Sequence, residues 1–98
     1  MTIVKKLENS KLSIALEGRL DTTTAPELEA AIKDSLDSVT ELVMDFKDLE
    51  YISSAGLRVL LSAQKIMNKQ GSMVVTNVND DIYEVFDVTG FSDLLTIE

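Results

Sequence analysis

Two adjacent serines stand just before an apolar stretch, in the segment Ser53-Ser54-Ala55-Gly56. Serines in this position mark the start of a helix, where a side-chain hydroxyl accepts a hydrogen bond from an unpaired backbone amide. The same helix end carries the positive pole of the dipole, so a phosphate added to a serine there is locally tolerated. Gly56 leaves room where the backbone of another protein could approach. The segment therefore predicts either a hydroxyl group open to modification or, more simply, a helix cap.

The residue types that the chain lacks limit its chemistry. It has no cysteine and no histidine, which excludes disulfides, thiolate nucleophiles and catalysis by serine–histidine or cysteine–histidine pairs. Any metal would have to be a hard cation held by oxygens, and scattered carboxylates such as Asp21 and Asp48 usually only bind water. The carboxylates form no recognisable catalytic pair. We therefore expect no enzymatic activity, no cofactor and no metal.

The elements that position these residues follow from the spacing of apolar side chains. Strands and helices alternate after an opening hairpin, which predicts an α/β fold with a mixed sheet of about five strands covered by helices. Thr24 and Glu27 are spaced as a capping box at one helix start. The expected elements are a hairpin that turns at 8–11, a helix from 25 to about 38, a strand over 41–46, a polar connector over 47–52, a helix from 54 to about 70, a strand over 72–77, a short helix between 79–81 and 89–90, and a last strand over 94–97.

Size and charge indicate a single small domain. The chain has 98 residues, long enough for one modest core, and no segment reads as a linker or a repeat. The formal net charge of −8 disfavours nucleic acid and anionic membrane surfaces as partners. No apolar run is long enough to span a bilayer, and the first residues do not read as a signal peptide. We expect a soluble protein of the cytoplasm.

Several segments are informative together, namely Gly18-Arg19-Leu20-Asp21, the strand over 42–48, Ser53-Ser54-Ala55-Gly56-Leu57 and the stretch over 86–91. In this order they resemble the second-strand end, the central strand, the phosphorylation-site segment and the final helix of STAS domains, specifically of the anti-sigma factor antagonists. The likeness covers nearly the whole chain. It implies one STAS domain over residues 1–98.

The resemblance also implies a function. In that family a partner that is both an anti-sigma factor and a serine kinase of the GHKL type phosphorylates the serine two positions before the glycine, which is Ser54 here. The unphosphorylated antagonist captures the partner and frees the sigma factor, and a serine phosphatase restores this form. Ser53 stands where the family usually has aspartate, and it is the second choice as acceptor. The nucleotide belongs to the partner, and we expect the free chain to be monomeric.

The surface for such a partner is expected at this helix start and at the loop after the second strand. The series Leu57, Leu60 and Leu61 is more typical of a core than of an interface, whereas Arg58 should point away from that core. The loop over 21–24 has two interpretations, either a partner contact or only a turn and a helix start. The implied partner-binding residues are Asp21, Thr22, Thr23, Ser53, Ser54, Ala55, Gly56, Leu57 and Arg58.

Two other functions remain open. The family includes modules of transporters, stress-signalling complexes and lipid-trafficking systems, so the chain could be a stand-alone STAS adaptor for a different partner. It could also be a small-molecule or nucleotide-binding domain that uses the helix start at Ser54–Gly56 as an anion site. The second alternative lacks a phosphate-binding loop of the Gly-x-x-x-x-Gly-Lys type.

Overall fold

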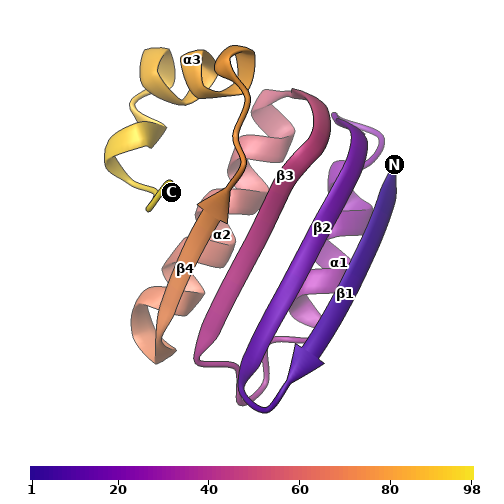
Figure 1. Cartoon of the computed structure of the whole chain (residues 1–98), viewed down its shortest axis with the longest axis vertical. Coiled ribbons are helices and arrows are strands. Elements are labelled where there is room, and N and C mark those ends of the chain that lie inside the picture. The colour runs from indigo at the N-terminus through magenta and orange to yellow at the C-terminus, as the bar shows by residue number, and fades with distance from the viewer.

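The computed structural model describes all 98 residues as an α/β domain (Figure 1). The elements in chain order are β1 (Thr2–Glu8), β2 (Lys11–Leu20), α1 (Ala25–Lys33), β3 (Glu41–Ile52), α2 (Ser54–Gln70), β4 (Ser72–Thr76), α3 (Asp80–Thr89) and the short 3₁₀ helix η1 (Phe91–Asp93). The strands form one mixed sheet in the order β1-β2-β3-β4. Only β1 is antiparallel to its neighbour. The predicted mixed α/β sheet is confirmed.

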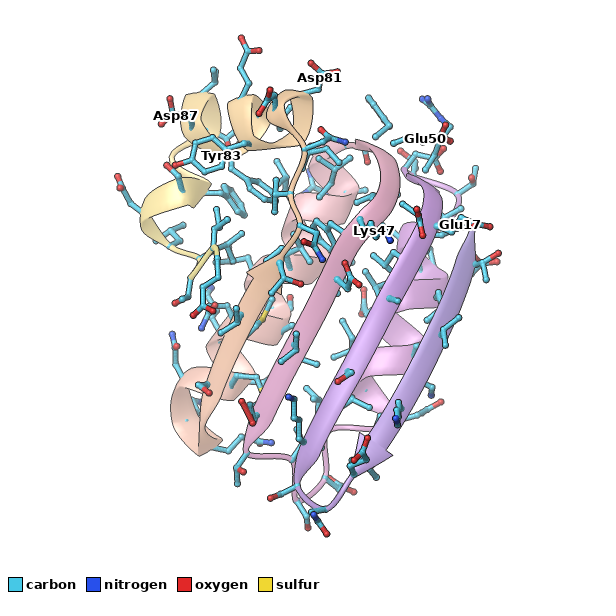
Figure 2. All side chains as sticks on the ribbon, in the orientation of Figure 1. Glu17, Lys47, Glu50, Asp81, Tyr83 and Asp87 are labelled. Atoms are coloured by element: carbon cyan, nitrogen blue, oxygen red, sulfur yellow. The ribbon has the colours of Figure 1, made fainter.

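The helices cover only one face of the sheet. Figure 1 shows α1 and α2 on one face of the sheet and α3 beyond the upper end of β4, which leaves the other face uncovered. Glu17 and Lys47 lie toward that open face (Figure 2). None of the helices combines the length and the apolar character that a bilayer span demands.

The core lies between the sheet and the two covering helices. Alternate strand residues are buried, as period-two spacing predicts for a half-covered sheet. Phe86 anchors α3 on the sheet, because its ring lies 6.4 Å from that of Phe46 in β3, centroid to centroid. The buried strand residues are Leu12, Ile14, Leu16, Leu20, Leu42, Met44, Phe46, Leu49, Ile52, Met73 and Val75, and they share one core with buried helix residues that include Leu28 and Ile32 of α1 and Val59, Leu60, Ala63 and Met67 of α2.

The third strand is longer than the sequence pattern indicated. Residues 47–52, expected to be a polar connector, continue β3 to Ile52. Two register shifts against β2 explain the difference, because the pairs Ala15–Asp45, Glu17–Asp48 and Arg19–Tyr51 each advance further along β3 than along β2. Every such bulge adds one residue, so the buried positions there recur at every third residue instead of every second.

The last expected strand, over 94–97, is wrong. The chain after α3 folds into η1, where the amides of Leu94 and Leu95 donate to the Phe91 carbonyl at 3.0 and 2.9 Å. Only one residue then reaches the sheet, as an isolated parallel bridge from Ile97 to Val75. These local hydrogen bonds satisfy the backbone of a short apolar segment that would otherwise extend. The sheet therefore has four strands instead of about five.

The first helix is shorter than predicted, and the other helix boundaries are confirmed. α1 ends at Lys33 rather than near Ser38, which has a left-handed backbone with φ of 64°. Leu36 is nevertheless buried, so the apolar spacing correctly predicted that its side chain is buried but overestimated the length of the helix. α3 is capped at its start by Asn79, whose side chain accepts a bond from the Ile82 amide, and at its end by Gly90 in the left-handed conformation.

Candidate functional site at the start of α2

The ends of β2 and β3 bring the two sequence-predicted segments together. Leu20 and Ile52 are paired in the parallel register, and the Ser53 amide donates to the Leu20 carbonyl at 2.9 Å. This bond ties the residue before Asp21 to the residue before Ser54. The loop over 21–24 and the start of α2 therefore lie side by side at the same edge of the sheet, as expected for the carboxyl ends of parallel strands.

The two serines have different structural roles. Ser53 is the N-cap of α2, has an extended backbone, and its hydroxyl accepts from the Gly56 amide at 3.4 Å. Ser54 is the first residue of the helix, its side chain is exposed, and its hydroxyl takes part in no hydrogen bond within the chain. The cap assignment is thus confirmed for Ser53. Ser54 keeps an open hydroxyl, and its role as a phosphoacceptor stays a prediction.

The loop after β2 is organised by the carboxylate of Asp21. Its Oδ1 accepts from the Thr23 amide at 3.0 Å, from the Thr23 hydroxyl at 2.7 Å and from the Thr24 amide at 3.2 Å. These donors, led by the Thr23 hydroxyl, hold the pKa of Asp21 below its usual value, because they favour the charged carboxylate. Asp21 is therefore an ionised Asx-turn residue that shapes this side of the site.

The predicted capping box at α1 is wrong. Thr24 occupies the N-cap position, but its side chain makes no capping bond. Its hydroxyl instead accepts from the Asp21 amide and donates to the Arg19 carbonyl, both at 2.8 Å. The sequence spacing was right for a box, but backbone groups of Asp21 and Arg19 lie closer to the Thr24 hydroxyl, which the spacing rule does not consider.

Arg19 and Tyr51 form a contact that the sequence reasoning missed. The two residues are partners across β2 and β3, and the Arg19 guanidinium carbon lies 4.2 Å from the centroid of the Tyr51 ring. Arg19 Nε also lies 3.9 Å from Asp21 Oδ2. Cation–π contact and ion pairing together restrain this arginine at the edge of the site. Only recognition of the bulges in β3 could have revealed the pair from the sequence.

Gly56 and Leu57 support the site from beneath and do not present a side chain on its surface. A Cβ on Gly56 would lie 2.7 Å from Leu20 Cγ and 2.9 Å from Ile52 Cγ1, so the glycine is required by the close packing of α2 on the sheet. Leu57 is only 5% exposed and belongs to the core. The expectation that Gly56 makes room for another protein is corrected, because the side chains that occupy this room are Leu20 and Ile52 of this chain.

A groove lies along the seam between α1 and α2 and reaches Ala55, the residue after Ser54. It encloses about 360 Å³ and is lined by Thr22, Ala25, Pro26, Glu29, Ala55, Arg58, Val59 and Ser62. Arg58 is exposed, as the helical spacing predicted. The structure thus brings together at the surface Thr22, Ser54, Ala55 and Arg58 from the predicted partner-binding set, with Asp21, Thr23 and Ser53 forming its scaffold.

Comparison with known proteins gives this geometry a context. The sequence model of the STAS domain family matches residues 2–98. The chain is 35% identical over 88 residues to BtrV of Bordetella bronchiseptica, named provisionally as an anti-sigma factor antagonist, covering 88% of this chain and 76% of the relative. It is 30% identical over 95 residues to the anti-sigma-B factor antagonist of Bacillus subtilis, covering 96% of this chain and 86% of that protein.

The fold is shared with solved structures as well. The crystal structure of an anti-sigma factor antagonist from Mycobacterium paratuberculosis superposes with a TM-score of 0.88 at 25% identity. The superposition covers 98% of this chain and 83% of the other.

Proposed function

This chain belongs to the STAS domain family, and on that premise we propose that it is an anti-sigma factor antagonist. In this proposal the unmodified chain binds an anti-sigma factor through the surface around Ser54 and thereby frees a sigma factor. Phosphorylation of Ser54 ends the binding. The observation that carries the proposal is the open hydroxyl of Ser54 at the start of α2. The resemblance to the family implies that this serine is the phosphoacceptor.

The chemistry of the switch belongs to the partners. The anti-sigma factor acts as a serine kinase of the GHKL type, and the Ser54 oxygen attacks the γ-phosphorus of its ATP. The new P–O bond to serine forms as the bond to ADP breaks, and the hydroxyl proton passes to a base of the kinase. A serine phosphatase later hydrolyses the ester and releases inorganic phosphate. In this proposal the chain supplies only the hydroxyl, so it needs no catalytic residue. A kinase that uses ATP fits a cytoplasmic location.

The effect of the phosphate follows from its charge. Phosphorylation adds roughly −1.5 to −2 units at one exposed point. The start of α2 tolerates this charge because of the helix dipole, so the fold is expected to persist. A dry or acidic partner surface opposite Ser54 would then lose several kcal/mol of binding, about tenfold in affinity for each ~1.4 kcal/mol. The contact is broken by charge alone.

The experiment has two stages. A pull-down with the wild-type chain and with Ser54→Asp, followed by mass spectrometry, identifies the bound proteins and the modified residue. Titration of the retained kinase then compares Ser54→Ala, Ser54→Asp and the phosphorylated chain. We expect affinity to fall in that order, because aspartate carries about one charge and a phosphate up to two. Equal affinity for all three forms, or a phosphate on Ser53 instead, would refute the proposal.

A further inference from the structure

Arg58 lies one helical turn after Ser54 on the same side of α2. Residues four apart in a helix have Cβ atoms about 5–6 Å from each other. Helical side chains also lean toward the N-terminus, so a long side chain at position 58 extends back over the first turn. Both residues are exposed. The guanidinium of Arg58 can therefore reach a group attached to the Ser54 oxygen.

Arg58 has no partner of its own in the chain. The ion pairs are Lys6–Glu8, Arg19–Asp21 and Lys33–Glu29, and no hydrogen bond uses the Arg58 side chain. The chain has one other arginine, Arg19, and it is held by Tyr51 and Asp21. Arg58 is thus the arginine that remains free beside the modification site.

The surroundings of Arg58 leave space for an anion but provide no second cation. Arg58 lines the groove of about 360 Å³ between α1 and α2, where the other charged residue is Glu29. Glu29 is paired with Lys33 of its own helix at 2.8 Å. The carboxylate of Asp21 borders the same edge of the sheet. Elsewhere the chain is strongly acidic, with no lysine or arginine after Lys69 and with Asp81 and Asp87 projecting from α3 (Figure 2).

We propose that Arg58 captures the phosphoryl group of phosphorylated Ser54, in a bidentate ion pair within α2. The inference rests on the proposed modification of Ser54. A planar guanidinium matches two phosphate oxygens at once, and the pair forms between adjacent helical turns with little loss of freedom. The phosphate is then held over the seam between α1 and α2, and Arg58 is withdrawn from any carboxylate of a partner. Arg58 acts as a positioning residue for the modified state.

The test needs neither the kinase nor the partner. Phosphoserine is installed at position 54 by genetic encoding or chemical synthesis, and ³¹P NMR titration measures its second pKa. Arg58 favours the dianion, so Arg58→Gln should raise this pKa by about 0.5 unit, roughly threefold in the dissociation constant. Arg58→Lys should fall between the two, since it keeps the charge and loses the planar fork.

A matched control distinguishes a direct contact between Arg58 and the phosphate from the general electrostatic field of the protein. Lys65→Gln removes the same charge from an exposed position further along α2, so it should leave the phosphoserine pKa near the wild-type value. Equal shifts in Arg58→Gln and Lys65→Gln, or no shift in either, would overturn the inference. Failure here is distinct from failure of the proposed function, which would appear as a partner that binds all forms alike.

Discussion

Two helices begin at the same edge of the sheet with hydroxyl-rich segments, and the chain uses them differently. Before α1, Thr23 and Thr24 place their hydroxyls in hydrogen bonds with Asp21 and Arg19. Before α2, Ser53 caps the helix and the Ser54 hydroxyl is left without a partner. The first segment is a closed turn, whereas the second offers a reactive group to the surroundings. Hydrogen-bond partners, and not residue types, thus distinguish the hydroxyls that hold the backbone in place from those that stay free, which are Ser54 in the second segment and Thr22 in the first.

The largest loss of stability is expected from a substitution beneath the start of α2, because the open segment with Ser54 is held in place there by close packing. Gly56→Ala places a methyl group against Leu20 and Ile52, and overpacking of this kind costs about 1–3 kcal/mol of the free energy of unfolding. Chemical denaturation measures the loss. In a Leu20→Ala background, which removes one of the obstructing side chains, the same substitution should cost less. An additive double mutant would show that the glycine is not needed for packing.

The contribution of the hydroxyl bonds to the closed turn before α1 is tested by removing one hydroxyl. Thr24→Val keeps the shape of the side chain but loses the bonds to the Arg19 carbonyl and the Asp21 amide. We expect a loss of about 1–2 kcal/mol of stability. Thr22→Val is the matched control, since Thr22 is exposed and its side chain makes no hydrogen bond, and it should change stability by less than about 0.5 kcal/mol. Equal effects would mean that the turn does not depend on its hydroxyl bonds.

Substitutions of the two serines at the start of α2 should differ in their effect on the free energy of unfolding. Ser53→Ala removes the helix cap and should cost about 0.5–1 kcal/mol, at the low end for caps because the bond is 3.4 Å long. Ser54→Ala should remain within about 0.5 kcal/mol of the wild type, since the hydroxyl contributes no bond to the fold. A larger loss from Ser54→Ala than from Ser53→Ala would reverse the roles assigned here.

The smallest effect is the pH dependence of the closed turn. The pKa of Asp21 is lowered in the folded chain, so its contribution to stability is complete above the unfolded pKa and is lost as pH falls through the folded pKa. At neutral pH nothing should change, and the loss begins below about pH 4. Carboxyl ¹³C NMR should show that Thr23→Val raises the Asp21 pKa, because it removes the strongest donor. An unchanged pKa would assign the shift to another cause.

The order of elements and the place of the serines could be read from the sequence, because period-two and helical spacing are strong in β2, β4 and α2. The end of β3 could not, since its bulges break the alternation that identifies a strand. The last segment failed for the opposite reason. Leu94 to Ile97 look like a strand in isolation, but competition between local turns and sheet pairing is decided by tertiary context.

Within the site, residue types predicted position better than role. Ser53, Ser54 and Arg58 lie where the helical pattern placed them. Gly56 was assigned to a contact surface although it is buried, because a motif does not state which side of the helix faces the sheet. Leu57 stood in the same set, but its helical spacing correctly indicated the core. The bonds of Asp21 and the contact of Arg19 with Tyr51 needed coordinates, since they depend on the geometry of a bulged strand end.

The central claim is that negative charge on Ser54 breaks a protein contact. The most direct measurement is a titration of the kinase retained in the pull-down against two singly modified chains. One carries phosphoserine at 54 and the other at Ser10, an exposed turn residue between β1 and β2, at the end of the sheet opposite the pair of Leu20 and Ile52. We predict at least a tenfold loss of affinity, about 1.4 kcal/mol, for the first chain and wild-type affinity for the second. Equal affinity for both modified chains would contradict the account.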